Sequence, residues 1–225
     1  MGERITLATT GGKPFSAWRA APGDARRGGL VVLHPIWGVT PHIREFSDGL
    51  ADQGYEVFAP SLLDGTNAFP DQNIDAPILD DRLGLGEASG WGLATLDVVQ
   101  ASIDALEGPV FLLGFCFGGS TAWLAAARCQ GLSAVACFYG GDIVNRLGET
   151  PKVPTILHFG TRDETIPPEA VTAITAAHPD LPAWLYPAGH AFVAPTGGYH
   201  ADSATLAMLR TLQLFQRSGG GRGEV

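Results

Sequence analysis

The stretch VFLLGFCFGGSTAWLAAA (Val110–Ala127) contains an apolar run, a glycine-rich turn around Cys116 and an alanine-rich run. The first run is typical of a buried strand and the last of a helix. Glycines around the turn let the helix pass close to the strand, as in the GxSxG turn that carries a nucleophile, here with Cys in place of Ser. A glycine-flanked cysteine can also be an ordinary buried thiol, so other residues of the sequence are needed to distinguish a nucleophile from a packing residue.

Similar apolar runs recur along the chain, and helix-like segments separate them. They cover residues 29–34, 55–60, 109–114, 133–140, 154–160 and 183–189. Runs that are apolar throughout indicate strands buried on both faces, and so a mostly parallel sheet. The segments RITLAT and FSAWRAA, separated by TGGKP, predict an antiparallel hairpin at one edge. The sequence therefore predicts an α/β fold, a doubly wound sheet with helices on both faces and a site at the carboxyl ends of its strands.

The chain has 225 residues, enough for one large core, so we expect a single domain over residues 1–217. Residues 218–225, SGGGRGEV, predict a flexible tail. Residues 61–90 are rich in Asp, Gly and Pro, and they predict a long loop with a binding or lid role rather than a regular element.

Charge and composition favour a small-molecule partner. Lys and Arg number 14 and Asp and Glu 23, which gives a net charge of −9, and the sequence has no basic cluster of the kind that binds a phosphate backbone, which argues against nucleic acid as a partner.

Apolar stretches are too short for a membrane span and no signal peptide begins the sequence, so a cytoplasmic location without membrane contact is expected. Three cysteines without metal-ligand spacing indicate reduced thiols, and Cys129 and Cys137 favour packing roles. The oligomeric state, monomer or homodimer, stays open.

Two further residues follow predicted strands. Asp163 lies in TILHFGTRDETIPP and His190 in LYPAGHAF. Alone, Asp163 could cap the helix that begins near Pro167, and His190 could be a structural histidine. Together with Cys116 they give nucleophile, acid and histidine in the order that α/β-hydrolases use, which favours catalysis.

The segments GFCFGG, GTRDETIP, AGHAF and LHPIWGVTPHIREFSDGLADQGYEVFAPSL together resemble the dienelactone hydrolase family over nearly the whole chain. The resemblance implies that Cys116 is the nucleophile, His190 its base and Asp163 the group that orients the imidazole. It also implies that the backbone N–H groups of Ile36 and Phe117 bind the developing oxyanion. No metal or organic cofactor is implied.

Two positions depart from the pattern of this family. Pro35 stands where the family has a Glu that helps to control the resting thiol, so Cys116 would depend on His190 and on the helix end. Ala194 stands where the family has an Arg that holds the substrate carboxylate. A carboxylate would lose its bidentate partner, which weakens the case for a dienelactone as substrate.

Further contacts with substrate are less clearly marked. Trp37, Trp91 and Tyr139 lie near strand ends or the long loop and could line an apolar pocket, although large aromatics there are usually core. Arg82 could supply a positive charge, but a solvated surface arginine is the favoured interpretation. His34 and His42 flank the oxyanion loop without metal-like company, and we interpret them as structural or pocket-lining.

The sequence thus predicts a hydrolase that cleaves a small ester, lactone or thioester through an acyl-enzyme on Cys116. One alternative is a non-catalytic α/β module that binds a ligand or partner, suggested by Pro35 and Ala194. Another is a glutamine amidotransferase or DJ-1-like cysteine enzyme. It is less favoured because those place an acid close to the histidine, whereas no carboxylate follows His190 until Asp202.

Overall fold

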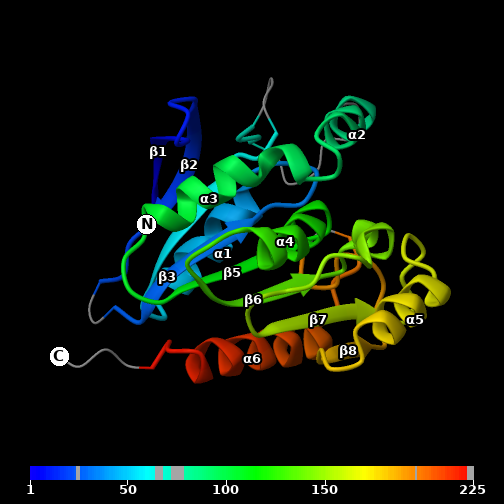
Figure 1. Ribbon diagram of the computed structural model, residues 1–225. Coiled ribbons are helices and arrows are strands. Elements are labelled where there is room, and N and C mark those ends of the chain that lie inside the picture. Colours follow the sequence, from blue (N-terminus) through cyan, green and yellow to red (C-terminus); the bar gives the residue numbers. More distant parts are fainter. Residues whose placement is uncertain (24–25, 64–67, 72–78, 196, 222–225) are drawn as a thin grey trace.

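The computed structural model describes residues 1–23, 26–63, 68–71, 79–195 and 197–221. Eight strands within these ranges form one sheet in the order β1-β2-β4-β3-β5-β6-β7-β8 (Figure 1). The strands are β1 (Glu3–Ala8), β2 (Pro14–Ala20), β3 (Gly28–Leu33), β4 (Tyr55–Pro60), β5 (Val110–Phe115), β6 (Leu132–Phe138), β7 (Thr155–Gly160) and β8 (Ala183–Tyr186).

Helices connect these strands. They are α1 (Pro41–Ala51), α2 (Leu79–Ala88), α3 (Leu96–Asp104), α4 (Phe117–Arg128), α5 (Pro168–Ala177) and α6 (Ala201–Arg217), with short 3-10 helices η2 (Leu93–Thr95) and η3 (Gly141–Arg146). None of the helices in the described ranges is both long and apolar enough to cross a membrane.

Strand pairing confirms the predicted α/β class. β1 and β2 form an antiparallel hairpin at one edge, β2 pairs antiparallel with β4, and all the remaining pairs are parallel. Every residue of β3, β5 and β7 is buried, as expected for apolar strands that are covered on both faces. Because parallel strands end at the same edge, the segments after β3, β5, β7 and β8 share one side of the sheet.

Aromatic contacts show which helices share a face. Phe215 of α6 stacks on Phe111 of β5 with ring centroids 4.8 Å apart, and Phe46 of α1 meets Phe115 edge-on at 5.2 Å. Residues four apart on a strand point to the same face, so α1 and α6 cover the same face of the sheet. Figure 1 shows α3 and α4 side by side on the opposite face.

Thr40 and Pro41 define the start of helix α1. The Thr40 hydroxyl accepts a hydrogen bond from the Ile43 N–H at 3.4 Å, and Pro41 occupies the first turn, where its missing N–H costs nothing. The helix start therefore fixes the end of the loop that follows β3.

The prediction that residues 61–90 hold no regular element is wrong for the last part of the segment, which forms α2. Asp80 and Asp81 stabilise the positive end of this helix. Gly86 lets it approach the core, since a Cβ there would lie 3.0 Å from the Cδ1 of Ile36. The segment that forms α2 has a low intrinsic helix propensity, and its packing against the core compensates for this. Residues 64–67 and 72–78 lie outside the described residues.

The predicted tail starts directly after α6, yet its first residues are packed. The Gly220 N–H donates to the Phe215 carbonyl at 2.9 Å, and Gly220 is buried against the Phe111 ring. The segment predicted as a flexible tail therefore begins with residues that contact the core. Residues 222–225 lie outside the described residues.

Candidate active site

Cys116 lies in the sharp turn between β5 and α4. Its backbone has φ 54° and ψ −114°, a conformation that costs a non-glycine residue about 1–3 kcal/mol. Two backbone bonds hold it there, since the Cys116 N–H donates to the Phe138 carbonyl at 3.0 Å and the Ser120 N–H donates to the Cys116 carbonyl at 3.1 Å. The strain is compensated by the packed sheet and helix on either side, and the thiol is presented at the sheet edge.

The glycines of this turn are required by close backbone contacts. A Cβ on Gly114 would lie 2.0 Å from the Gly118 carbonyl oxygen, and one on Gly118 would lie 2.3 Å from the Leu33 carbonyl oxygen. A Cβ on Gly119 would lie 2.3 Å from the Phe138 carbonyl oxygen. The turn is therefore pressed between β3 and β6, as the sequence GFCFGG predicts.

Asp163 and His190 meet beside this turn. Nδ1 of His190 lies 2.7 Å from Oδ2 of Asp163, whose side chain is 1% exposed. The other oxygen of Asp163 accepts the backbone N–H groups of Thr165 at 2.9 Å and Ile166 at 3.1 Å. Asp163 therefore stabilises the turn before α5 and contacts His190 at the same time, but it does not cap α5, whose N-cap residue is Pro167 without a side-chain hydrogen bond.

Thr165 is a member of this cluster that the sequence did not predict. Its hydroxyl donates to Oδ1 of Asp163 at 2.6 Å, and its oxygen lies 2.8 Å from Nδ1 of His190. Because the hydroxyl proton is used by Asp163, the oxygen must accept from His190, which places a proton on Nδ1. The signal in the sequence was the hydroxyl two residues after Asp163, a common turn pattern.

Electrostatics favour a charged His190. Burial lowers the pKa of His190, but hydrogen bonds with Asp163 and Cys116 and the negative charges on both outweigh burial and raise the pKa to about 10. For Asp163 burial acts in the raising direction, yet the hydrogen bonds from His190 and Thr165 leave its pKa below the ordinary value. These interactions stabilise an imidazolium at His190 beside the carboxylate of Asp163.

Two cavities adjoin at Cys116 and His190. The first, with a volume of about 310 Å³, has mostly apolar walls: Pro35, Trp37, Thr40, His42, Ile43, Phe115, Tyr139, Ala191, Ala194, Gly197 and Gly198. The second, about 360 Å³, is lined by Ile36, Leu83, Trp91, Phe117, Ser120, Gly141, Asp142, Asn145, Thr165 and Ile166. The structure thus places Ile36 and Phe117 together on one side of Cys116, and Trp37 and Tyr139 on the other. Burial lowers the pKa of His42, so this side chain of the first cavity is neutral at pH 7.

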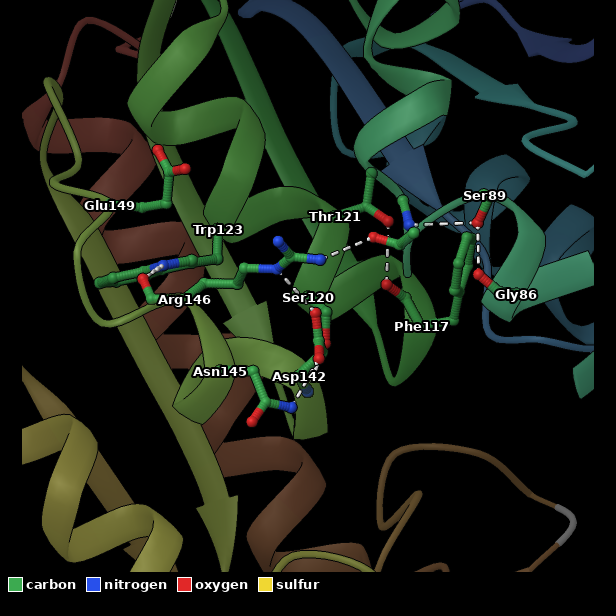
Figure 2. A network of polar contacts seen from close by, with 12 residues as sticks. Gly86, Ser89, Phe117, Ser120, Thr121, Trp123, Asp142, Asn145, Arg146 and Glu149 are labelled. Carbon is green, nitrogen blue, oxygen red and sulfur yellow. Dashed lines mark hydrogen bonds and ion pairs between the residues drawn. The ribbon is translucent and has the colours of Figure 1, made fainter.

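Trp91 reaches the second cavity from a strained turn. It has φ 51° and stands between Gly90 and Gly92, which also have positive φ. Hydrogen bonds of Arg146 connect this turn to η3 (Figure 2). Nη2 of Arg146 donates to the Gly90 carbonyl and Nε donates to Oδ2 of Asp142, both at 3.0 Å. This network holds the Trp91 ring 6.5 Å from that of Phe117.

Arg82 differs from the sequence expectation. It lies on α2 and is 2% exposed, so the prediction of a solvated surface arginine is wrong. The described walls of the two cavities do not include Arg82. Its charge acts instead on buried His34, whose pKa is lowered to about 4 by burial first and by this charge as well. Among residues 1–23, 26–63, 68–71, 79–195 and 197–221, no three His, Cys, Asp or Glu side chains are grouped as metal ligands.

Comparison with known proteins identifies the family. The family model described as "Dienelactone hydrolase family" matches residues 15–219. The chain is 30% identical over 230 residues to the carboxymethylenebutenolidase of Pseudomonas putida, covering 95% of each chain. A crystal structure described as a "Putative Dienelactone Hydrolase" from Klebsiella pneumoniae superposes with a TM-score of 0.82 at 25% identity, covering 96% of this chain and 98% of that one.

A second solved structure, of a dienelactone hydrolase-like promiscuous phosphotriesterase from metagenomic libraries, has a TM-score of 0.76 at 22% identity and covers 96% of this chain and 98% of that one, which shows the same fold. The match of the family model excludes the glutamine amidotransferase alternative. With its mostly parallel sheet and its cysteine at the turn after β5, the chain belongs to the dienelactone hydrolase family and is a hydrolase of the α/β-hydrolase superfamily.

Proposed function

We propose that the chain hydrolyses small, uncharged esters or lactones through an acyl-enzyme on Cys116, with His190 as acid and base and Asp163 as the orienting carboxylate. One observation carries the proposal: among the described lining residues, Cys116 and His190 are the two that both cavities share, and Asp163 is hydrogen-bonded to His190. A substrate carbonyl placed between the cavities would meet the sulfur and the imidazole together.

The chemistry would proceed in two halves. The Cys116 thiolate adds to the carbonyl carbon, and the tetrahedral oxyanion is held by the N–H groups of Ile36 and Phe117. As the carbon–oxygen bond to the leaving group breaks, that oxygen takes the proton of the His190 imidazolium. Water then attacks the thioester while His190 accepts its proton, and the carbon–sulfur bond breaks to release the acid and restore the thiolate.

The walls of the cavities support an uncharged substrate. None of their described residues is Lys or Arg. Ala194, where the family has a carboxylate-binding arginine, lies in the first cavity, and the second contains the carboxylate of Asp142. Oδ2 of Asp142 is paired with Nε of Arg146 at 3.0 Å, so this carboxylate is not free to attract a cationic substrate. As a carboxylate it also cannot bind an anionic substrate.

Selective labelling tests Cys116 as the nucleophile of this hydrolase. Burial raises the pKa of Cys129 to about 11 and raises that of Cys137 further, so both stay protonated at pH 7. We expect iodoacetamide at pH 7 to alkylate Cys116 first, with loss of p-nitrophenyl acetate hydrolysis in step with labelling. Cys116→Ala should abolish this hydrolysis and Cys129→Ala should leave it unchanged. Equal, slow labelling of all three thiols together with full activity of Cys116→Ala would overturn the proposal.

We also propose that the chain works in the reducing cytoplasm. All three cysteines are free thiols, and a nucleophilic thiol is lost on oxidation.

A further inference from the structure

We propose that His34 is a positioning residue of the oxyanion site: it holds the carbonyl of the Pro35–Ile36 peptide and thereby aims the Ile36 N–H at the reacting oxygen. The inference rests on the proposed function, because it concerns how that site is built. His34 is not among the described residues that line either cavity, so its effect must pass through the peptide.

Both ring nitrogens of His34 are used, and their roles can be assigned. The ring is fully buried, Nδ1 lies 2.6 Å from the Pro35 carbonyl oxygen, and the Leu62 N–H donates to Nε2 at 3.0 Å. A backbone N–H can only donate, so Nε2 accepts and the ring proton is on Nδ1. Nδ1 therefore donates to Pro35.

The peptide geometry carries this bond over to Ile36. The Pro35 carbonyl and the Ile36 N–H belong to one planar peptide unit, and no peptide bond in the described residues is cis. In a trans peptide the two groups point in opposite directions. Fixing the oxygen in the core therefore fixes the direction of the N–H on the other side, where Ile36 lines the second cavity.

A second donor to the same oxygen does not make His34 redundant. The Gly38 N–H also donates to the Pro35 carbonyl, at 3.1 Å. That bond closes a turn within the loop and would move with it. His34 instead connects the loop to Leu62, beyond the end of β4, and so ties it to the sheet.

His34 also contacts the segment that carries the other proposed donor. Its ring stacks on Phe117, with centroids 6.3 Å apart and an interplanar angle of 23°. The backbone passes equally close here, since a Cβ on Gly118 would lie 2.7 Å from the His34 carbonyl oxygen. The buried His34 side chain therefore lies between the Pro35–Ile36 peptide and the start of α4, and it contacts both.

Three variants separate the two hydrogen bonds. His34→Asn keeps an amide donor near the position of Nδ1, His34→Gln keeps an acceptor near the position of Nε2, and His34→Leu keeps neither. Each would be assayed for kcat and KM with p-nitrophenyl acetate, for the rate of Cys116 alkylation by iodoacetamide and for thermal unfolding. Loss of a whole oxyanion donor costs about 10²–10³-fold in kcat, so misdirection of one should cost roughly 10- to 100-fold.

We expect that loss in kcat for His34→Leu and His34→Gln, little change in KM, and at least partial recovery in His34→Asn. Alkylation by iodoacetamide should proceed at the parent rate in all three, because displacement at a saturated carbon develops no oxyanion. A purely structural role would lower activity in proportion to stability and would not favour Asn over Gln.

Equal kcat losses in His34→Asn and His34→Gln, or hydrolysis and alkylation that fall together, would overturn the role of His34. If His34→Leu does not fold, the comparison of Asn with Gln decides alone. Failure of the proposed function is seen separately, as hydrolysis that survives Cys116→Ala.

Discussion

The contact between Asp163 and His190 gives the sharpest single perturbation, Asp163→Asn. The asparagine keeps an oxygen that can accept from the Thr165 and Ile166 N–H groups, so the turn should survive. It presents an amide N–H to Nδ1 of His190, which must then accept, and the ring proton moves to Nε2. The nitrogen left for Cys116 then no longer accepts a proton.

The structure sets the size of the effect. The rise in the pKa of His190 from 6.5 to about 10 corresponds to roughly 5 kcal/mol in favour of the imidazolium, and Asp163 and Cys116 share this stabilisation. Removing the share of Asp163, together with the tautomer change, should lower kcat/KM about 10²–10⁴-fold.

The assay is steady-state hydrolysis of p-nitrophenyl acetate from pH 5 to 10, with urea denaturation to check the fold. Glu164→Gln changes the exposed carboxylate next in the chain and serves as the control, expected to match the parent. An Asp163→Asn variant within a factor of about three of the parent at every pH would refute the orienting role.

Three further outcomes are expected. Gly114→Ala should lower the free energy of unfolding in urea by about 2–5 kcal/mol, because the new Cβ would lie 2.0 Å from the Gly118 carbonyl oxygen. Gly84→Ala is the control and should not lower this free energy, because no packed neighbour lies within 4 Å of its Cβ. Equal stabilities of the two variants would contradict the close contact at Gly114. Burial lowers the pKa of His34 to about 4 and that of His158 to about 3, so both add stability above pH 6.5 that is lost as pH falls toward 4, about 3 kcal/mol each; a urea midpoint that does not change between pH 7 and pH 4 would refute this. Ala194→Arg should improve hydrolysis of a p-nitrophenyl ester that ends in a carboxylate at least about tenfold relative to its uncharged analogue, and an unchanged ratio would place position 194 away from the substrate.

The fold could be predicted because its signals are local. Strands buried on both faces are apolar throughout, and a turn as tight as that of Cys116 needs glycines on both sides. The positions of Asp163 and His190 after successive strands also follow from the sequence, since parallel strands end at one edge.

The features that the sequence did not predict depend on contacts between distant segments. Arg82 is buried although arginine is usually exposed, and the helix that carries it has two internal glycines and owes its place to packing against Ile36. Thr165 and the structural His34 make hydrogen bonds to partners 25 and 28 residues away, and such pairs leave no periodic pattern in a sequence, so these bonds could not be predicted from it. Polar residues with local turn or core roles are therefore the part of a site that a sequence shows least.

Detection of the acyl-enzyme tests the nucleophilic role of Cys116 most directly. The protein is mixed with p-nitrophenyl acetate, quenched in acid within the first turnovers and analysed by intact and peptide mass spectrometry, in parallel with Cys116→Ala. We expect a burst of p-nitrophenol and one acetyl group, located on Cys116 and absent from the variant. Steady hydrolysis without an adduct on Cys116, or an equal rate in Cys116→Ala, would contradict it.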